Sequence, residues 1–330
     1  MKRITLASLL FVIALPTVCL LSLAVGSADI PLPDLLSGLF WREGFATEST
    51  ILYAIRLPRL VAALIAGAGL SLSGVLLQAV MGNPLASPNT IGVNAGAGLF
   101  TVLFLSFLPH LAAALPLASF LGAFFAALII LAIARATGNG GSHTIILAGI
   151  ACTTLFQAAI SFFHILDDDV LVAYNAFAVG SFEGVTLSVL PLPAILIAVG
   201  LFCALALSGR IAALTLGDEI ASSLGIRTAR LRVLCLVLAC LCAASAVSFA
   251  GLLGFVGLVV PHITRRLFGN NMRTQLAASP FVGATIVVLS DLVARTLFAP
   301  AEIPVGIVMA FVGTPFFLYL LLCRRKEVEP

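Results

Sequence analysis

The sequence predicts an all-α, polytopic membrane protein with about ten transmembrane helices in a single domain over residues 1–330. Two observations lead to this fold class. Only 9% of the 330 residues are charged and 61% are hydrophobic, whereas a soluble domain carries roughly a quarter charged residues. The hydrophobic residues also form unbroken runs of about 20 residues, the length that a helix needs to cross a bilayer. A transmembrane β-barrel would instead show short segments of alternating hydrophobicity.

Ten runs qualify as spans. The first is longer than the roughly 7–15 apolar residues of a secretory signal, so it is expected to stay in the membrane. The eighth is the shortest, because Gly251 and Gly254 favour a turn at its start. The expected spans are 4–26, 58–80, 91–108, 115–134, 143–165, 189–207, 231–250, 253–268, 277–296 and 305–323.

The distribution of basic residues predicts the topology. With an even number of spans, both termini lie on the same side. Of the 17 Lys and Arg residues, only Arg42, Arg56, Arg59 and Arg295 fall on the opposite side. Because basic residues concentrate on the cytoplasmic side of membrane proteins, both termini are expected in the cytoplasm. The other basic residues fall on that side: Lys2, Arg3, Arg135, Arg210, Arg227, Arg230, Arg232, Arg265, Arg266, Arg273, Arg324, Arg325 and Lys326.

The longest polar stretch between spans, Thr215–Arg232, has the pattern of a short capped helix. Asp218 is expected as the N-cap, and Glu219 follows in the first turn, where the helix dipole favours anions. Gly225 is expected as the left-handed residue that ends the helix, with Ile226 as the apolar contact after it. Such a helix on the cytoplasmic face suits docking of a partner; an ordered loop without partner is the alternative.

Two outer segments also have the pattern of local structure. Residues 28–50 contain a short amphipathic run, Leu35–Trp41. Residues 166–187 open with three aspartates and continue through an apolar stretch, Val170–Val179, that is too short to cross. A helix of this length at membrane depth is tolerated only where it lines a cavity or is buried in protein. We expect a lip helix at about 170–180.

The chain lacks the motifs of an enzyme or an ATPase. A P-loop requires a lysine that reaches the phosphates, and the only lysines are Lys2 and Lys326. No HExxH or GxSxG motif is present. The seven cysteines lie in apolar runs without metal-ligand spacing and are expected as small core residues. No metal or cofactor is therefore expected on this chain, and energy for active transport would have to enter through another protein.

Asp291 is the clearest ionisable residue inside a span. An intramembrane carboxylate can mark a proton relay, but Arg295 lies four residues later on the same helix face. The sequence favours an ion pair between them, which argues against a proton-coupled carrier.

Three outer cations, Arg56, Arg59 and Arg295, run against the charge bias. They suit an acidic protein partner or an anionic solute, and lipid headgroup anchoring is the plainer alternative. On the inner side, the turn Asn83–Pro88 holds two prolines and an asparagine, which predict a rigid non-helical corner.

Taken together these stretches resemble the FecCD family, the permease subunits of ABC importers for ferric siderophores, haem and cobalamin. The motifs follow in order along nearly the whole chain. They are RLPR (56–59), the Gly/Ala/Ser-rich span to Gln78, NPLASP (83–88), LGDEIASSLGI (216–226), GFVGLVVPHITRRLFG (254–269), GA (283–284), DLVAR (291–295) and EIPVGI…GTPFF (302–317). One departure is Gly82 before Asn83, where the family usually has Arg.

The resemblance implies the type II ABC importer permease fold, in a homodimer or pseudo-dimer with the translocation path at the two-fold axis. It implies residues that couple to a cytoplasmic ATPase: Gly217, Asp218, Glu219, Ser222, Leu224 and Gly225. It implies that Arg56, Arg59 and Arg295 pair with glutamates of a substrate-binding protein. The residues that match the cytoplasmic gate are Asn83, Leu85, Ser142 and His143. Those that match the periplasmic gate are Asp169, Ala173, Asn175 and Gly180.

The expected function is the permease subunit of an importer in the bacterial inner membrane, with an iron chelate as cargo. Its expected partners are a cytoplasmic ABC ATPase dimer that holds the ATP and Mg, a substrate-binding protein, a second permease copy or paralogue, and membrane lipid, but no nucleic acid. Haem or cobalamin is the alternative cargo. An ATP-independent carrier or channel is the alternative class, and a membrane enzyme is the least favoured.

Overall fold

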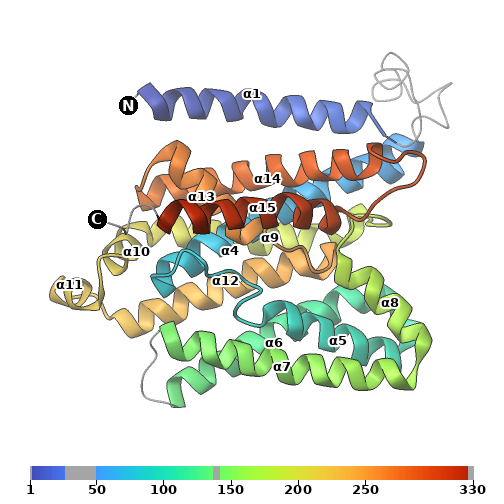
Figure 1. Cartoon of the computed structure of the whole chain (residues 1–330), viewed down its shortest axis with the longest axis horizontal. Coiled ribbons are helices and arrows are strands. Elements are labelled where there is room, and N and C mark those ends of the chain that lie inside the picture. The colour runs from blue at the N-terminus through green and yellow to red at the C-terminus, as the bar shows by residue number, and fades with distance from the viewer. Residues whose placement is uncertain (1, 27–49, 137–141, 326–330) are drawn as a thin grey trace.

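The computed structural model describes residues 2–26, 50–136 and 142–325 as a bundle of helices, and no strand occurs among them. Both termini lie at the same end of the bundle (Figure 1), as the even number of spans predicts. The expected run Leu35–Trp41 lies outside the described residues.

Each of the ten expected spans corresponds to one helix. Six are long and apolar enough to cross a membrane by length and composition, and the chain is thus a multi-pass membrane protein. The ten helices are α1 (Lys2–Ala24), α4 (Leu57–Met81), α5 (Val93–Phe107), α6 (Leu115–Ala136), α7 (Ser142–Leu166), α9 (Pro191–Ala206), α12 (Thr228–Ala250), α13 (Val256–Phe268), α14 (Met272–Thr296) and α15 (Val305–Arg325).

Shorter elements connect them. A π-helical turn, η1, leads directly into α4, and three short helices lie between the spans. These elements are η1 (Ile51–Arg56), η2 (Pro109–Ala114), α8 (Asp168–Val179), η3 (Leu187–Val189), α10 (Ser208–Leu214) and α11 (Asp218–Ser223). Helix α10 was not expected from the sequence. It follows α9 almost without a break and carries the chain to α11.

Helix α4 is the centre of the bundle and is buried along most of its length, packed by α12, α13 and α14. Its small residues allow this. A methyl group at Gly74 would overlap the carbonyl of Gly257 on α13, and one at Gly67 would lie 2.5 Å from the carbonyl oxygen of Gly283 on α14. The small-residue pattern therefore brings helix backbones together, as helix association in membranes requires.

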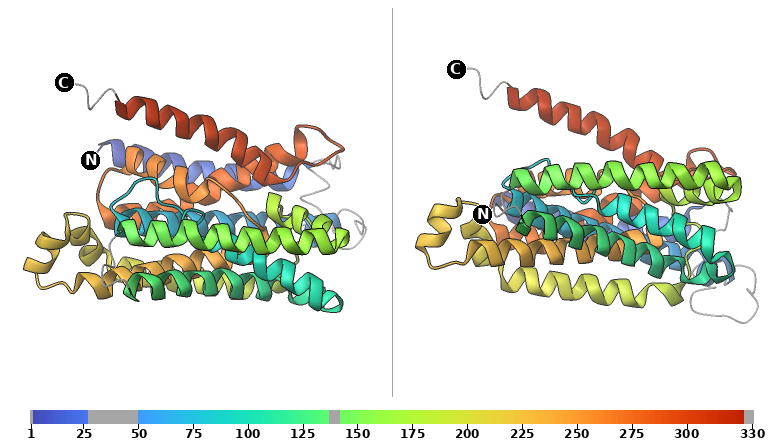
Figure 2. Two further views of the ribbon diagram at one scale, coloured as in Figure 1. Left: turned by 60° about the horizontal axis from the view of Figure 1, so that its bottom comes forward. Right: turned by 90° about the horizontal axis from the view of Figure 1, so that it is seen from below.

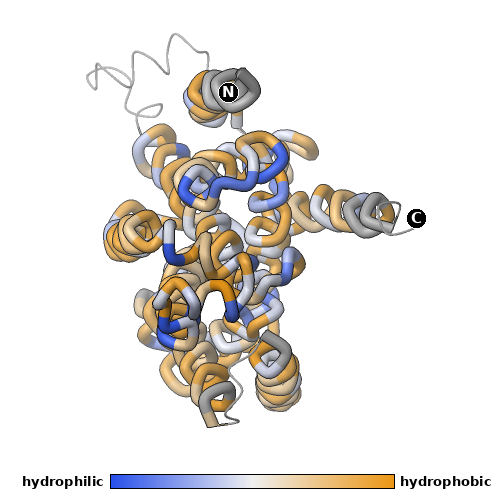
Figure 3. The backbone as a smooth tube through the Cα atoms, turned by 90° about the vertical axis from the view of Figure 1, so that its left-hand side faces the viewer, coloured by the Kyte–Doolittle hydropathy of each residue, from blue (hydrophilic) through white to orange (hydrophobic). Residues whose placement is uncertain are grey.

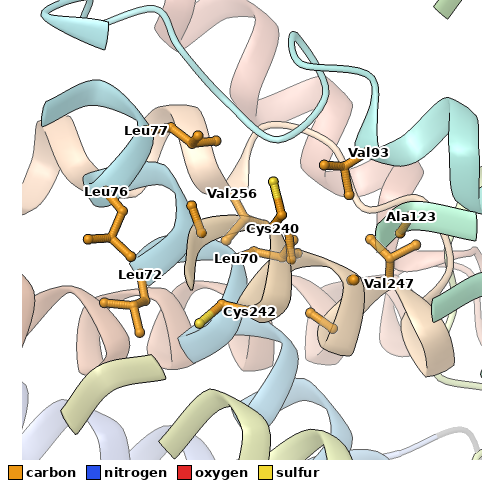
Figure 4. Packing of buried hydrophobic residues seen from close by; sticks show 14 of the residues in the cluster. Leu70, Leu72, Leu76, Leu77, Val93, Ala123, Cys240, Cys242, Val247 and Val256 are labelled. Atoms are coloured by element: carbon orange, nitrogen blue, oxygen red, sulfur yellow. The ribbon is translucent and has the colours of Figure 1, made fainter. Parts of the chain in front are cut away.

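Around α4 the core consists mainly of apolar side chains. Figure 4 shows Leu70, Leu72 and Leu76 of α4 beside Cys240 and Cys242 of α12. The expectation that the cysteines are core residues is confirmed for four of the six whose side chains the structure describes, and all six are free. Cys152, Cys235, Cys240 and Cys242 are buried, and Cys19 and Cys203 are half-buried.

Helix α13 is short for a spanning helix, as the eighth span predicts. Its 13 residues rise about 20 Å at 1.5 Å per residue, less than the roughly 30 Å hydrocarbon core. Gly251 and Phe255 both have positive φ, of 70° and 64°. The chain therefore crosses the remaining depth in a turn and a short non-helical segment, packed inside the protein.

Not every helix is enclosed. Helix α15 diverges from the rest of the bundle toward the C-terminus (Figure 2). Helix α7 has exposed apolar side chains along its length, among them Leu147, Leu155 and Ile165. In a membrane protein such faces contact lipid or another subunit.

Candidate functional sites at the two ends of the bundle

Helix α11 projects from the end of the bundle that also carries both termini (Figures 1 and 2). Figure 3, viewed from that end, shows short hydrophilic stretches against a largely hydrophobic bundle. The six predicted coupling residues, Gly217, Asp218, Glu219, Ser222, Leu224 and Gly225, are all exposed. The sequence therefore located a protruding element correctly.

The C-terminal end of α11 has the predicted cap. Gly225 has φ of 77° and donates its N–H to the Ser222 carbonyl at 2.9 Å. The Ile226 N–H bonds the Ala221 carbonyl at 3.1 Å. This pair of bonds is the Schellman motif, in which a left-handed glycine ends the helix.

The predicted N-cap of α11 is wrong. Gly217, with φ of 111°, occupies the N-cap position, and Asp218 is the first helical residue. The Asp218 carboxylate accepts a hydrogen bond from Arg232 Nη2 at 2.8 Å instead. An ion pair with a cation of the next helix thus takes the place of a bond to the helix's own N–H groups.

An apolar ridge runs along the exposed side of the α11 segment. Ile220 and Leu224 are four residues apart and share one face of the helix, and Leu216 lies just before the N-cap. The side chains of Leu216, Ile220 and Leu224 are 63%, 49% and 63% exposed. Ala221 is buried and anchors the helix to the body. A protruding ridge of large apolar side chains in a polar loop is typical of a surface that docks a partner.

The inner turn is rigid, as predicted. Helix α4 ends at Gly82 with φ of 56°. The Asn83 side-chain oxygen then accepts the Leu85 N–H at 2.9 Å, and the Asn83 backbone carbonyl accepts the Ala86 N–H at 3.1 Å. The other two predicted cytoplasmic-gate residues, Ser142 and His143, begin α7, and their side chains lie outside the described part.

The three outer arginines gather at the opposite end, but their side chains are buried. Arg56, Arg59 and Arg295 are 3%, 6% and 3% exposed, where the sequence analysis expected outward-facing cations. Each is held by other parts of the same chain. The expectation of exposure is thus corrected, because long-range partners that no local pattern shows draw these side chains inward.

Two of these arginines cap the end of α1. Arg56 Nη1 donates to the carbonyls of Leu23 and Ala24 at 2.6 and 2.9 Å. Arg295 Nη2 donates to the carbonyl and hydroxyl oxygens of Ser22. The last carbonyls of a helix lack intrahelical partners and carry the negative end of its dipole. The two guanidinium groups therefore hold α1 against the bundle.

The third arginine forms a buried charge cluster. Arg59 Nε donates to Asp291 Oδ1 at 2.8 Å, and Arg59 Nη1 pairs with Glu302. The predicted Asp291–Arg295 pair is present, with Arg295 Nε 3.5 Å from Asp291 Oδ2. Arg59 is nevertheless the closer partner. Two arginines neutralise the buried carboxylate, so Asp291 acts as a structural ion-pair partner.

The predicted lip helix is α8. Asp167 caps it, accepting the N–H groups of Asp169 and Val170 at 3.0 and 3.4 Å. Val170 and Tyr174 anchor one face of α8 in an apolar cluster with α5 and α7. Burial raises the pKa of the Tyr174 phenol, which therefore stays protonated.

The predicted periplasmic-gate residues divide into two groups. Asp169, Ala173 and Asn175 are exposed on the free side of α8. Gly180 is buried, with φ of 79°, and its carbonyl accepts the Gly306 N–H at 3.1 Å. Gly180 therefore joins α8 to the start of α15 and does not face an opening in this structure.

Arg232 was counted in the sequence only as one more inner cation. The structure gives it contacts to both α11 and the end of α4. No local pattern reveals this role, because the two partners are 14 and 152 residues away.

Comparisons with known proteins agree with these features. The FecCD transport family model matches residues 11–323. The Fe(3+)-citrate import system permease protein YfmD of Bacillus subtilis (strain 168) is 39% identical, over 91% of this chain and 89% of YfmD. The hemin transport system permease protein HmuU of Yersinia pestis is 33% identical, over 94% of this chain and 95% of HmuU.

A solved structure has the same architecture. It is an inward-facing conformation of a metal-chelate type ABC transporter, with a TM-score of 0.83 and 31% sequence identity. The alignment covers 94% of this chain and 97% of that one. The match therefore extends over the whole bundle.

Proposed function

Because the chain belongs to the FecCD transport family and is a permease subunit of an ABC transporter, we propose that it imports an iron chelate, with a ferric siderophore as the favoured cargo. One observation favours an iron chelate over haem: the relative named for ferric citrate shares more identity with the chain than the one named for hemin. Haem and cobalamin are the alternative cargoes of the same importer class.

A permease is not itself catalytic, so the proposal places ATP and Mg on a partner, a dimeric cytoplasmic ATPase. The ridge of Leu216, Ile220 and Leu224 supports α11 as the element that this partner holds. Its apolar side chains would fill a groove, and Asp218 and Glu219 would meet the groove's polar rim. Closure of the ATPase would then move α11, and the spans would rock between outward and inward openings.

The proposed setting is the bacterial inner membrane, with both termini in the cytoplasm. The bias of basic residues toward the end with the termini supports this orientation. A second permease, either this chain or a paralogue, would complete the translocation path. The uncovered apolar faces of α7 and α15 offer area for that contact and for lipid.

The gates are assigned by position. The rigid turn of Asn83 and Leu85, with Ser142 and His143 at the start of α7, is the proposed cytoplasmic gate. Helix α8, through Asp169, Ala173 and Asn175, is the proposed periplasmic gate, and Gly180 is its fixed end. The path needs only weak contacts with the chelate, since a separate binding protein supplies the affinity.

Docking of that binding protein through Arg56, Arg59 and Arg295 remains part of the proposal. The clustering of three cations at one end supports it. Their burial adds a condition: acidic groups of the partner must replace the α1 carbonyls and Asp291 as acceptors of these arginines.

Arg56→Gln should weaken association in a salt-dependent way. Arg273→Gln, which changes an exposed arginine at the inner end, should not. An affinity indifferent to salt and to Arg56→Gln contradicts this docking site.

The deciding experiment is ATP hydrolysis by a candidate ATPase bound to this chain in lipid nanodiscs. Binding proteins loaded with a ferric siderophore, haem or cobalamin would be added in turn. Stimulation by the siderophore-loaded protein alone is the expected result. Stimulation by another loaded protein would reassign the cargo. Uptake without ATP, in preparations from which no ATPase co-purifies, would favour the carrier or channel.

A further inference from the structure

Arg232 links three helices through one guanidinium group. It lies in the second turn of α12, with 16% of its side chain exposed. Its Nη1 donates to the Val80 carbonyl of α4 at 2.7 Å, and its Nη2 donates to the Asp218 carboxylate of α11 at 2.8 Å. A single planar group therefore connects the start of α11 to the inner end of α4.

The bond to Val80 has a cause in the sequence. In a continuing helix the Val80 carbonyl would accept the N–H of residue 84, but Pro84 has no N–H. The last carbonyls of α4 also carry the negative end of its dipole, which favours a cation. The Arg232 guanidinium supplies both a donor and a positive charge at this point.

The bond to Asp218 connects Arg232 to α11, the helix that the ATPase would move in the proposed mechanism. Asp218 is the first residue of α11, and its side chain is 56% exposed. Displacement of α11 moves the Asp218 carboxylate, and the guanidinium follows because the bond is short and charge-assisted.

The bond to Val80 passes this displacement on to the inner turn. Val80 lies three residues before Asn83, and the turn is internally fixed by the Asn83–Leu85 and Asn83–Ala86 bonds. A shift of the end of α4 therefore moves the turn as a unit.

We propose that Arg232 is the positioning residue that transmits movement of α11 to the inner turn 83–88. This inference rests on the proposed function for its physiological meaning, but the link itself is testable on the chain alone. The guanidinium is needed because its planar fork reaches two acceptors at once, whereas a lysine ammonium is a single point charge. Arg232→Lys should keep one contact and lose the other.

The first test needs no partner protein. Amide hydrogen exchange is measured at Leu85 and Ala86 of the full chain in nanodiscs. Coupling between sites typically corresponds to about 5- to 150-fold, so Arg232→Ala should raise exchange there at least about fivefold. Asp218→Asn should also raise it, and should add nothing in the Arg232→Ala background. The matched control is Arg230→Ala, an exposed arginine two residues earlier on α12, which should leave exchange unchanged.

The second test uses the complex with the ATPase and measures chelate taken up per ATP hydrolysed. Arg232→Ala should lower this ratio at least about fivefold, with ATPase binding retained because the apolar ridge of α11 is intact. Arg232→Lys should fall between Arg232→Ala and the wild type. A wild-type complex without ATP-driven uptake contradicts the proposed importer and leaves the exchange test to decide the role of Arg232.

Two results overturn the inference. One is an exchange rate at Leu85 and Ala86 that does not respond to Asp218→Asn in the wild-type background. The other is a ratio of chelate taken up to ATP hydrolysed that is the same for Arg232→Lys and the wild type. This second result can be obtained even if Arg232→Ala does not fold. A purely structural arginine would lower the yield of folded protein and raise amide exchange across the bundle, rather than at Leu85 and Ala86 alone.

Discussion

The two ends of the bundle each hold an aspartate in an ion pair with an arginine at 2.8 Å, yet the two pairs differ in almost every other respect. Asp291, at the outer end, is 1% exposed, and both Arg59 and Arg295 neutralise it. Asp218, at the inner end, is 56% exposed and has Arg232. The two pairs have equal distances, but the Asp291 pair is a buried structural contact and the Asp218 pair is an exposed contact that can move.

Desolvation is the physical reason. A carboxylate taken out of water must be paired, and removal of one partner leaves an uncompensated buried charge. An exposed pair gains little because water competes for both groups. Loss of the outer cluster should thus cost much stability, and loss of the inner pair should cost little. The following predictions test this contrast, from the largest expected effect to the smallest.

The largest effect is expected from Asp291→Ala. The substitution leaves Arg59 and Arg295 buried without their shared carboxylate, at a cost of about 3–5 kcal/mol in unfolding free energy. Denaturant unfolding in detergent measures this cost. Glu302→Gln is the matched control, since Glu302 is 27% exposed and should cost less. Equal stability of Asp291→Ala and the wild type would show that the outer cluster is not structural.

A large effect of another kind is expected from Ile220→Ser combined with Leu224→Ser. Buried apolar anchors of an interface cost about 2 kcal/mol or more when truncated, so binding of the ATPase should fall at least about thirtyfold. Stability should change within about 0.5 kcal/mol, as for other surface positions. Leu234→Ser, 45% exposed on α12, is the control, and a matching loss there would argue against α11 as the docking element.

A smaller effect is expected from Gly225→Ala. A left-handed conformation costs an ordinary residue roughly 1–2 kcal/mol, so the end of α11 should fray and exchange its amides faster. Gly209→Ala is the control, because Gly209 is helical and a methyl group there meets nothing within 4 Å. That substitution should be neutral or stabilise by up to about 1 kcal/mol. Equal behaviour of the two alanine variants would contradict the cap.

The smallest effect on stability is expected from Asp218→Asn. Exposed ion pairs contribute about 0–1 kcal/mol, and high salt should screen this pair while leaving the Asp291 cluster nearly unaffected. Unfolding at low and high salt measures both. A loss of about 3 kcal/mol or more would place Asp218 in the same class as Asp291 and remove the contrast between the two ends.

Local patterns in the sequence determined the fold and much of the inner end. Ten apolar runs corresponded to ten helices, because the length of a spanning run follows from bilayer thickness. The short eighth run became the short α13, because a turn at Gly251 precedes it. Gly225 ended α11, and Asn83 fixed the inner turn, because caps and turns depend on residues within a few positions of one another.

Only the tertiary structure decided where the charges pair. The sequence paired Asp291 with Arg295, four residues away, whereas its closer partner, Arg59, is 232 residues distant. It also assigned Asp218 to a cap, whereas Arg232 takes its carboxylate. Arginine side chains are long, and inside a membrane protein burial of a charge without a partner is costly. Their partners are therefore set by which helices pack together, and that packing brings together residues far apart in the chain.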